Sequence, residues 1–304
     1  MSFYIKDWQA GDLNALVKNL GEEVAVQIKN GKKIVVREGD ELVLKDAIRP
    51  LFDKHDRRIP EGLLANVCDA NRSFRLDQPV LAQKADYANR ILRLHGCFSI
   101  DTGVTAEQLK AGTERLLAII RENSQIANIV NGVYLPVVLP KLVTDNLGAE
   151  LELYLAGVNK SYIRTFSDRK FYNRRKGTLT NEVSVVEGSR HDQLIERMKQ
   201  ELVIGLHFPN PLQGYSFNAS REQMLTLPEG FILSGMDTPI AMAMYPDILA
   251  RGWNTPGLNL AALQWRSADY SLYFWANEDW LGFGHTGSLA DALGLYSGGL
   301  LFLG

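Results

Sequence analysis

The chain has 304 residues, of which 46% are hydrophobic and 22% are charged, and its formal net charge is -2. This is ordinary globular composition, and the length exceeds the usual size of one compact core, so two lobes are expected. The near-neutral charge gives no global attraction to nucleic acid or anionic membranes. The start of the chain lacks a secretory pattern, and no apolar run could cross a bilayer. We therefore expect a soluble cytoplasmic protein with no membrane partner.

The first part of the chain predicts a helix followed by a β-hairpin. Leucines and a valine form one apolar stripe along residues 12–20, which indicates a short helix. Two apolar runs then flank Asn30-Gly31, a dipeptide that tolerates the positive φ angles of a tight turn. The pattern predicts a hairpin over residues 24–37.

Prolines divide the next segment, residues 42–94, into expected helices. One is interrupted at Pro50, a short one begins at Pro60, and a longer one begins at Pro79. Each proline is placed where a helix can start or must end. The pattern therefore predicts three helical segments before residue 96.

The expected N-terminal lobe is α-rich and covers residues 1–148. A further helix is predicted from Thr105, whose side chain can form a capping box with Gln108. Residues 126–142 fit neither helical nor strand periodicity and are expected to cross between the lobes. The remaining residues, 149–304, are assigned to a second lobe.

The C-terminal lobe is expected to contain a mainly antiparallel sheet. Strand-like runs occupy much of residues 150–188 and return at 203–209 and 229–235. Between them, an amphipathic helix is predicted from Ser189, which can form a capping box with Asp192. The whole chain is therefore predicted to be an α+β protein.

Four of the five tryptophans lie between residues 253 and 285. The strand-like runs Leu258 to Trp265 and Tyr270 to Ala276 are separated by a polar turn and are expected to pair as an antiparallel hairpin. The second run has bulky apolar groups on both faces, which predicts a strand inside a sheet. The turn between Trp275 and Trp280 combines ring faces with polar groups, which can also hold a sugar or another small ring.

The C-terminal residues are expected to form a short helix and a buried strand. Residues 288–295 predict the helix, which Ser288 can cap. Four large apolar residues, 300–303, predict either a strand buried on both faces or contact with a second subunit. A homo-oligomer is therefore one expected assembly.

Basic and aromatic residues alternate between Tyr162 and Lys176. Guanidinium and ammonium groups can bind phosphate while the rings stack on planar groups, although charged strand edges also keep sheets from associating. The pattern favours a site for an anionic or phosphate-bearing ligand, and nucleic acid could bind only through this cluster. A protein partner is the other expected partner. The residues expected to bind this ligand are Arg164, Arg169, Lys170, Arg174 and Arg175.

A second set of residues indicates a different class of function. The string GHTGS around His285 resembles the Lys/His-Thr-Gly element of penicillin-recognising serine hydrolases, and SDRK from Ser167 to Lys170 and YAN from Tyr87 resemble its partner motifs. The resemblance implies a serine-type hydrolase with Ser167, Lys170 and His285 in catalytic roles. The order of these motifs along the chain departs from that of the family, and a helix cap at Ser288 explains the same string.

No metal or cofactor is expected. The five histidines and two cysteines are not spaced as metal or redox motifs, and the glycines form no nucleotide-binding loop. Cys68 and Cys97 are expected to be reduced core residues. The prediction is a binding or interaction protein of unknown ligand, and the alternative is the serine-type hydrolase.

Overall fold

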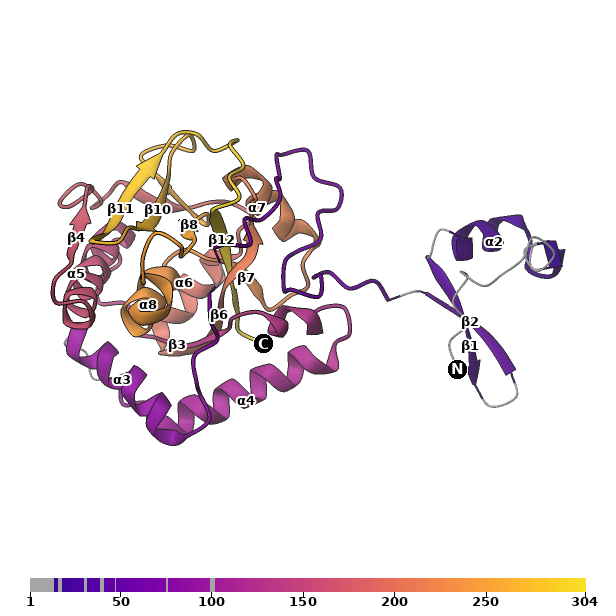
Figure 1. Ribbon diagram of the computed structural model, residues 1–304, viewed down its shortest axis with the longest axis horizontal. Coiled ribbons are helices and arrows are strands. Elements are labelled where there is room, and N and C mark those ends of the chain that lie inside the picture. Colours follow the sequence, from indigo (N-terminus) through magenta and orange to yellow (C-terminus); the bar gives the residue numbers. More distant parts are fainter. Residues whose placement is uncertain are drawn as a thin grey trace. The chain divides into compact units, whose positions relative to one another are not determined.

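The computed structural model describes residues 14–15, 18–29, 32–38, 41–46, 48–74, 76–98 and 102–304. Contacts between Cα atoms divide the chain into two units, Met1–Arg49 and Pro50–Gly304, and each is described by itself (Figure 1). The division differs from the boundary expected at residue 148, which lies within the second unit. None of the described helices is long and apolar enough to cross a membrane.

The first unit contains helix α2 (Glu22–Lys29) and the antiparallel strands β1 (Lys33–Glu38) and β2 (Glu41–Asp46). The expected hairpin over residues 24–37 is wrong, because its first strand is α2 and the two strands pair further along the chain. In α2 the buried side chains are three residues apart, at Ala25 and Ile28, which is helical spacing. The helix expected over residues 12–20 is seen at the described positions 14–15 and 18–20.

The second unit begins with an irregular segment, residues 50–74 and 76–83, so the helix expected from Pro60 is wrong. The helix expected before Pro50 is also wrong, because residues 41–46 form β2. Backbone amides of this segment donate hydrogen bonds to carbonyls at the end of β6 (Val203–Gln213), a strand that is distant in sequence. The amide of Arg58 donates to Pro211 O at 2.8 Å, and that of Cys68 donates to Gly214 O at 2.9 Å. Since these amides bond to another segment, they are not used in helical turns.

Helices flank a large sheet in the second unit (Figure 1). The α-helices in its described residues are α3 (Lys84–Phe98), α4 (Ala106–Glu122), α5 (Leu147–Thr165), α6 (His191–Gln200), α7 (Phe217–Gln223), α8 (Asp237–Met244) and α9 (Pro246–Leu249). Short 3-10 helices are η2 (Ala127–Asn131) and η3 (Met224–Thr226). The helix predicted from Thr105 is confirmed as α4, with both hydrogen bonds of the capping box to Gln108 present.

Helix α5 occupies residues 150–165, where strands were expected. Its buried side chains include Leu151, Leu155 and Val158, which are spaced as on one face of a helix. Asn146 caps it by accepting a hydrogen bond from Ala149 N at 2.8 Å. Gly148 is required near this end, because a Cβ atom there would lie 1.8 Å from Leu179 O.

The expected α+β class and mainly antiparallel sheet are confirmed. The order in the main sheet is β3 (Leu135–Leu139), β6 (Val203–Gln213), β12 (Tyr296–Phe302), β8 (Gly257–Leu260), β10 (Ser271–Ala276), β11 (Trp280–Thr286) and β4 (Lys170–Asn173). Only β12–β8 and β11–β4 are parallel pairs among these described neighbours. Strand β7 (Phe231–Leu233) also pairs with β12, and β5 (Val183–Val185) pairs with β9 (Leu263–Trp265).

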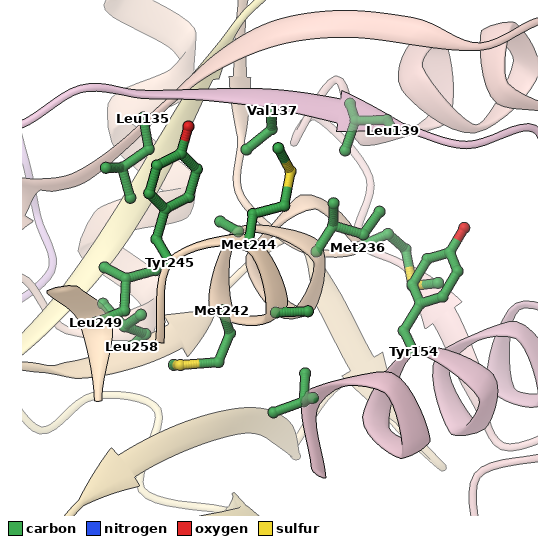
Figure 2. Packing of buried hydrophobic residues seen from close by; sticks show 14 of the residues in the cluster. Leu135, Val137, Leu139, Tyr154, Met236, Met242, Met244, Tyr245, Leu249 and Leu258 are labelled. Atoms are coloured by element: carbon green, nitrogen blue, oxygen red, sulfur yellow. The ribbon is translucent and has the colours of Figure 1, made fainter. Parts of the chain in front are cut away.

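The aromatic hairpin is confirmed in its main features, since β10 pairs antiparallel with β8 and lies inside the sheet between β8 and β11. The C-terminal residues form β12, a strand buried on both faces as predicted. Leu301 and Leu303 pack in the core under α3, α5 and α8, while Leu300 and Phe302 pack in the core beside α4 and α7. Figure 2 shows the first core, where side chains from β3 and α5 surround α8.

The helix predicted from Ser189 is confirmed as α6, whereas its expected cap and the helix expected over residues 288–295 are corrected. Helix α6 begins at His191 and its N-cap residue is Arg190, so the capping box expected between Ser189 and Asp192 is wrong. Ser189 Oγ accepts a hydrogen bond from His191 N at 3.3 Å and donates one to Val186 O at 2.6 Å. Residues 288–295 form turns and no helix. There Gln213 Nε2 donates to Gly294 O at 2.9 Å, which ties that segment to the end of β6.

Candidate functional site

A row of aromatic side chains crosses the sheet on the face opposite α5 and α8. The rings follow one another as Tyr296, Tyr273, Trp275, Trp280 and Tyr172, with centroid separations of 5.6, 5.0, 5.5 and 5.8 Å. These separations are those of interacting aromatic pairs. The row therefore runs without a break from the central strand β12 to the edge strand β4.

Gly282 of β11 makes room for the centre of this row. A Cβ atom at Gly282 would lie 2.5 Å from the ring of Trp275 and 2.7 Å from that of Trp280. The next residue, Phe283, points into the opposite core and packs against Phe274 at 4.8 Å. Glycine on one face and phenylalanine on the other thus let the tryptophan rings lie close to the strand.

A groove of about 680 Å³ lies between α5 and β4, where the aromatic row reaches the edge of the sheet. Tyr172 and Trp280 line it, and the amide side chain of Asn159 comes from α5. Two cationic side chains, Arg174 and Lys176, follow directly after β4 and complete the lining. The groove therefore combines aromatic surfaces, an amide and positive charge.

The cations of the groove have no acidic partners in the described part of the chain. Among the residues that the structure describes, no carboxylate lies within 4.0 Å of the charged nitrogens of Arg174 or Lys176. The guanidinium of Arg174 instead lies over the ring of Trp275, 5.1 Å from its centroid. The one acidic residue in the lining, Glu152, accepts hydrogen bonds from the backbone at Gly177.

The structure separates the five residues that were expected to bind an anion. Arg174 lines the groove, but the next residue, Arg175, packs over Trp265 at 5.1 Å from the ring centroid. Arg169 packs over Phe166 at 4.3 Å and donates to a backbone carbonyl. Alternation along the chain sends these neighbouring side chains to different surroundings.

Arg164 and Lys170 lie apart from the groove lining. Arg164 lines another cavity, of about 540 Å³, together with Arg90 and Arg93. Arg90 there is already bound by both carboxylate oxygens of Asp247, at 2.5 and 2.9 Å. Lys170 begins β4 and its side chain is exposed. Of the expected set, only Arg174 lines the groove at the end of the aromatic row.

The residues of the hydrolase alternative are not brought together. Lys170 is paired with Trp280, and His285 lies five residues further along β11, roughly 16 Å away at about 3.3 Å per residue. His285 packs against the ring of Trp265 at 4.4 Å. Burial, with the charges of Arg175 and Arg266, lowers the pKa of His285.

Ser167 is therefore expected to be unreactive. A fluorophosphonate probe should leave the wild-type chain unlabelled at Ser167, because neither proposed partner lies at hydrogen-bonding distance from its hydroxyl in the described contacts. Mass spectrometry of the digested protein measures this. Stoichiometric labelling of Ser167 that is lost in Ser167→Ala would instead support the serine-hydrolase alternative.

No local pattern in the sequence predicts the buried polar network around Asp237. Its Oδ2 accepts hydrogen bonds from His207 Nδ1 at 2.7 Å and from Ser234 Oγ at 2.8 Å, and its Oδ1 accepts from Gly235 N at 2.7 Å. Burial opposes ionisation of Asp237, but the hydrogen bond and charge of His207 lower its pKa overall. Ser234 and His207 both donate hydrogen bonds to the same carboxylate. In a serine hydrolase the serine instead bonds to the histidine, so this network is not a catalytic triad.

Neither a metal site among the described residues nor a similar protein indicates a function for this chain. Within the described ranges, no three histidine, cysteine or acidic side chains are grouped so that they could hold a metal ion. Cys68 and Cys97 are free, and burial raises the pKa of Cys97. No protein-family model, curated protein or solved structure matches this chain.

Proposed function

We propose that the chain is a binding protein that holds an anionic, phosphate-bearing ligand in the groove between α5 and β4. The observation that carries the proposal is Arg174, which lines the groove, packs on the ring of Trp275 and has no acidic partner among the described residues. A guanidinium presents paired N–H donors that match phosphate and carboxylate oxygens. Lys176 adds a second positive charge to the same lining.

The aromatic surroundings support binding in two ways. Stacking of Arg174 on Trp275 contributes about 0.5–1 kcal/mol at an exposed site and restricts the orientations of the guanidinium. Tyr172 and Trp280 offer ring surfaces to an apolar or planar part of the ligand. The groove therefore suits a small ligand that carries an anionic group next to a ring.

A small anion fits this groove better than a nucleic acid strand does. A strand needs a series of cations along its path, whereas Arg169 and Arg175 are packed against other rings. The net charge of -2 also gives no long-range attraction to a polyanion. A cytoplasmic location and a homo-oligomer stay predictions from the sequence.

The double substitution Arg174→Ala and Lys176→Ala should weaken binding of inorganic pyrophosphate at least about tenfold. Hydrogen bonds to charged groups contribute about 1.5–3 kcal/mol each, and about 1.4 kcal/mol is a factor of ten in affinity. Isothermal titration calorimetry at fixed salt measures both affinities. Both side chains lie at the protein surface, so the melting temperature should hardly change.

The matched control removes two other exposed lysines, in Lys54→Ala with Lys141→Ala. This variant loses the same net charge away from the groove and should bind pyrophosphate like the wild type. The proposal is wrong if wild-type protein binds no pyrophosphate, or if the groove variant and the control lose the same affinity.

A further inference from the structure

A different cavity, which we call the tyrosine cavity, lies at the other end of the aromatic row, beside β8, β10 and β12. It encloses about 210 Å³, and its lining includes four aromatic side chains, of which Tyr273 and Tyr296 begin the row. Asn259 of β8 and the exposed Asp291 also line it. Its described lining contains no cationic side chain. The cavity therefore differs in charge from the groove beside β4.

Asn259 is the unusual residue of this cavity. It is paired across the sheet with Tyr273 of β10 and Gly298 of β12, so its side chain leaves the sheet on the face that carries the aromatic row. It is only 4% exposed, yet its buried side-chain oxygen Oδ1 accepts no hydrogen bond from the residues that the structure describes. A buried amide oxygen without a donor is costly and requires an explanation.

The chemistry of the lining specifies the kind of group that would satisfy Asn259. An amide both donates and accepts hydrogen bonds, as a hydroxyl group does. The Asp291 carboxylate at the rim disfavours an anion and accepts further hydrogen bonds from hydroxyl groups. Tyr273 and Tyr296 offer apolar ring surfaces, and burial raises the pKa of Tyr296 and keeps its phenol neutral. The volume has room for one small ring.

We propose that this cavity binds a single uncharged polyhydroxylated ring, such as a monosaccharide, whose hydroxyl groups pair with the Asn259 amide while a ring face packs on the tyrosines. A few convergent polar groups in an otherwise aromatic cavity are typical of small-ligand sites. This site does not depend on the anion groove, because it shares no lining residue with that groove.

Saturation-transfer NMR with methyl glycosides of glucose, galactose, mannose and N-acetylglucosamine tests the proposal on the full chain. At least one glycoside should receive saturation from the wild-type protein. Asn259→Leu keeps a side chain of similar size but removes both hydrogen-bonding atoms. It should lower the affinity for that glycoside at least about tenfold. The melting temperature should not fall, because the replaced amide oxygen has no partner to lose.

The matched control is Asn159→Leu, in which the same change is made in the groove of α5. It should bind the glycoside like the wild type. The proposal is overturned if no glycoside receives saturation, if binding survives Asn259→Leu, or if tetramethylammonium binds in place of every sugar. A cavity that holds only water gives the first of these results.

Discussion

Deletion of residues 300–304 is expected to prevent folding of the second unit. Strand β12 is hydrogen-bonded to β6, β7 and β8, and its apolar side chains enter both cores. Leu300, Leu301, Phe302 and Leu303 are each at most 6% exposed. At about 1.5–3 kcal/mol for each buried side chain, they contribute about 6–12 kcal/mol. This is comparable with the whole stability of a domain, about 5–15 kcal/mol.

Soluble expression and thermal unfolding followed by circular dichroism measure the effect of this deletion. The control is removal of Gly304 alone, which is exposed and should change the melting temperature little. A truncated chain that melts like the full-length protein would contradict the role of β12 in the core. If such a chain also changed from dimer to monomer, these residues would form a subunit interface instead.

Asp237→Ala is expected to lower the free energy of unfolding by about 2–5 kcal/mol, because each buried donor left without a partner costs about 1–3 kcal/mol. The substitution removes the carboxylate that accepts hydrogen bonds from three buried donors, His207 Nδ1, Ser234 Oγ and Gly235 N. Those groups belong to β6 and to the segment between β7 and α8, so the network joins the sheet to a core helix.

Urea unfolding measures this loss, with Asp145→Ala as the control. Asp145 is exposed, so its removal should change the free energy of unfolding by less than about 0.5 kcal/mol. Equal unfolding midpoints for Asp237→Ala and the wild type would show that the buried network does not stabilise the fold.

Periodicity predicted an element correctly where its local signal was unambiguous. The capping box at Thr105 identified α4, and the aromatic content of Tyr270 to Ala276 identified an interior strand. In α5, by contrast, alternating glutamate and leucine at the start imitated a strand, although the buried positions recur with helical spacing. In α2, Val24, Val26 and Ile28 alternate as in a strand and Asn30-Gly31 follows as in a hairpin turn, so the local pattern imitated a hairpin.

The candidate site could be predicted only in part, because tertiary packing assembles it. Arg174 was identified from its basic and aromatic neighbours, but Asn159 reaches the groove only because α5 packs beside β4. Arg175 is adjacent in sequence yet packs on Trp265, away from the groove lining. No local pattern marks Asn259, whose unpaired amide oxygen is visible only once β8, β10 and β12 are aligned.

Hydrogen–deuterium exchange of the wild-type chain, with and without inorganic pyrophosphate, tests the proposed anion groove most directly. We expect slower exchange with pyrophosphate in peptides that cover β4, residues 174–177 and the facing turns of α5. Peptides around Arg90 and Arg164, which line the other arginine cavity, should exchange at unchanged rates. Protection confined to the cavity lined by Arg90 and Arg164, or no protection anywhere, would contradict the proposal that the groove beside β4 binds the anion.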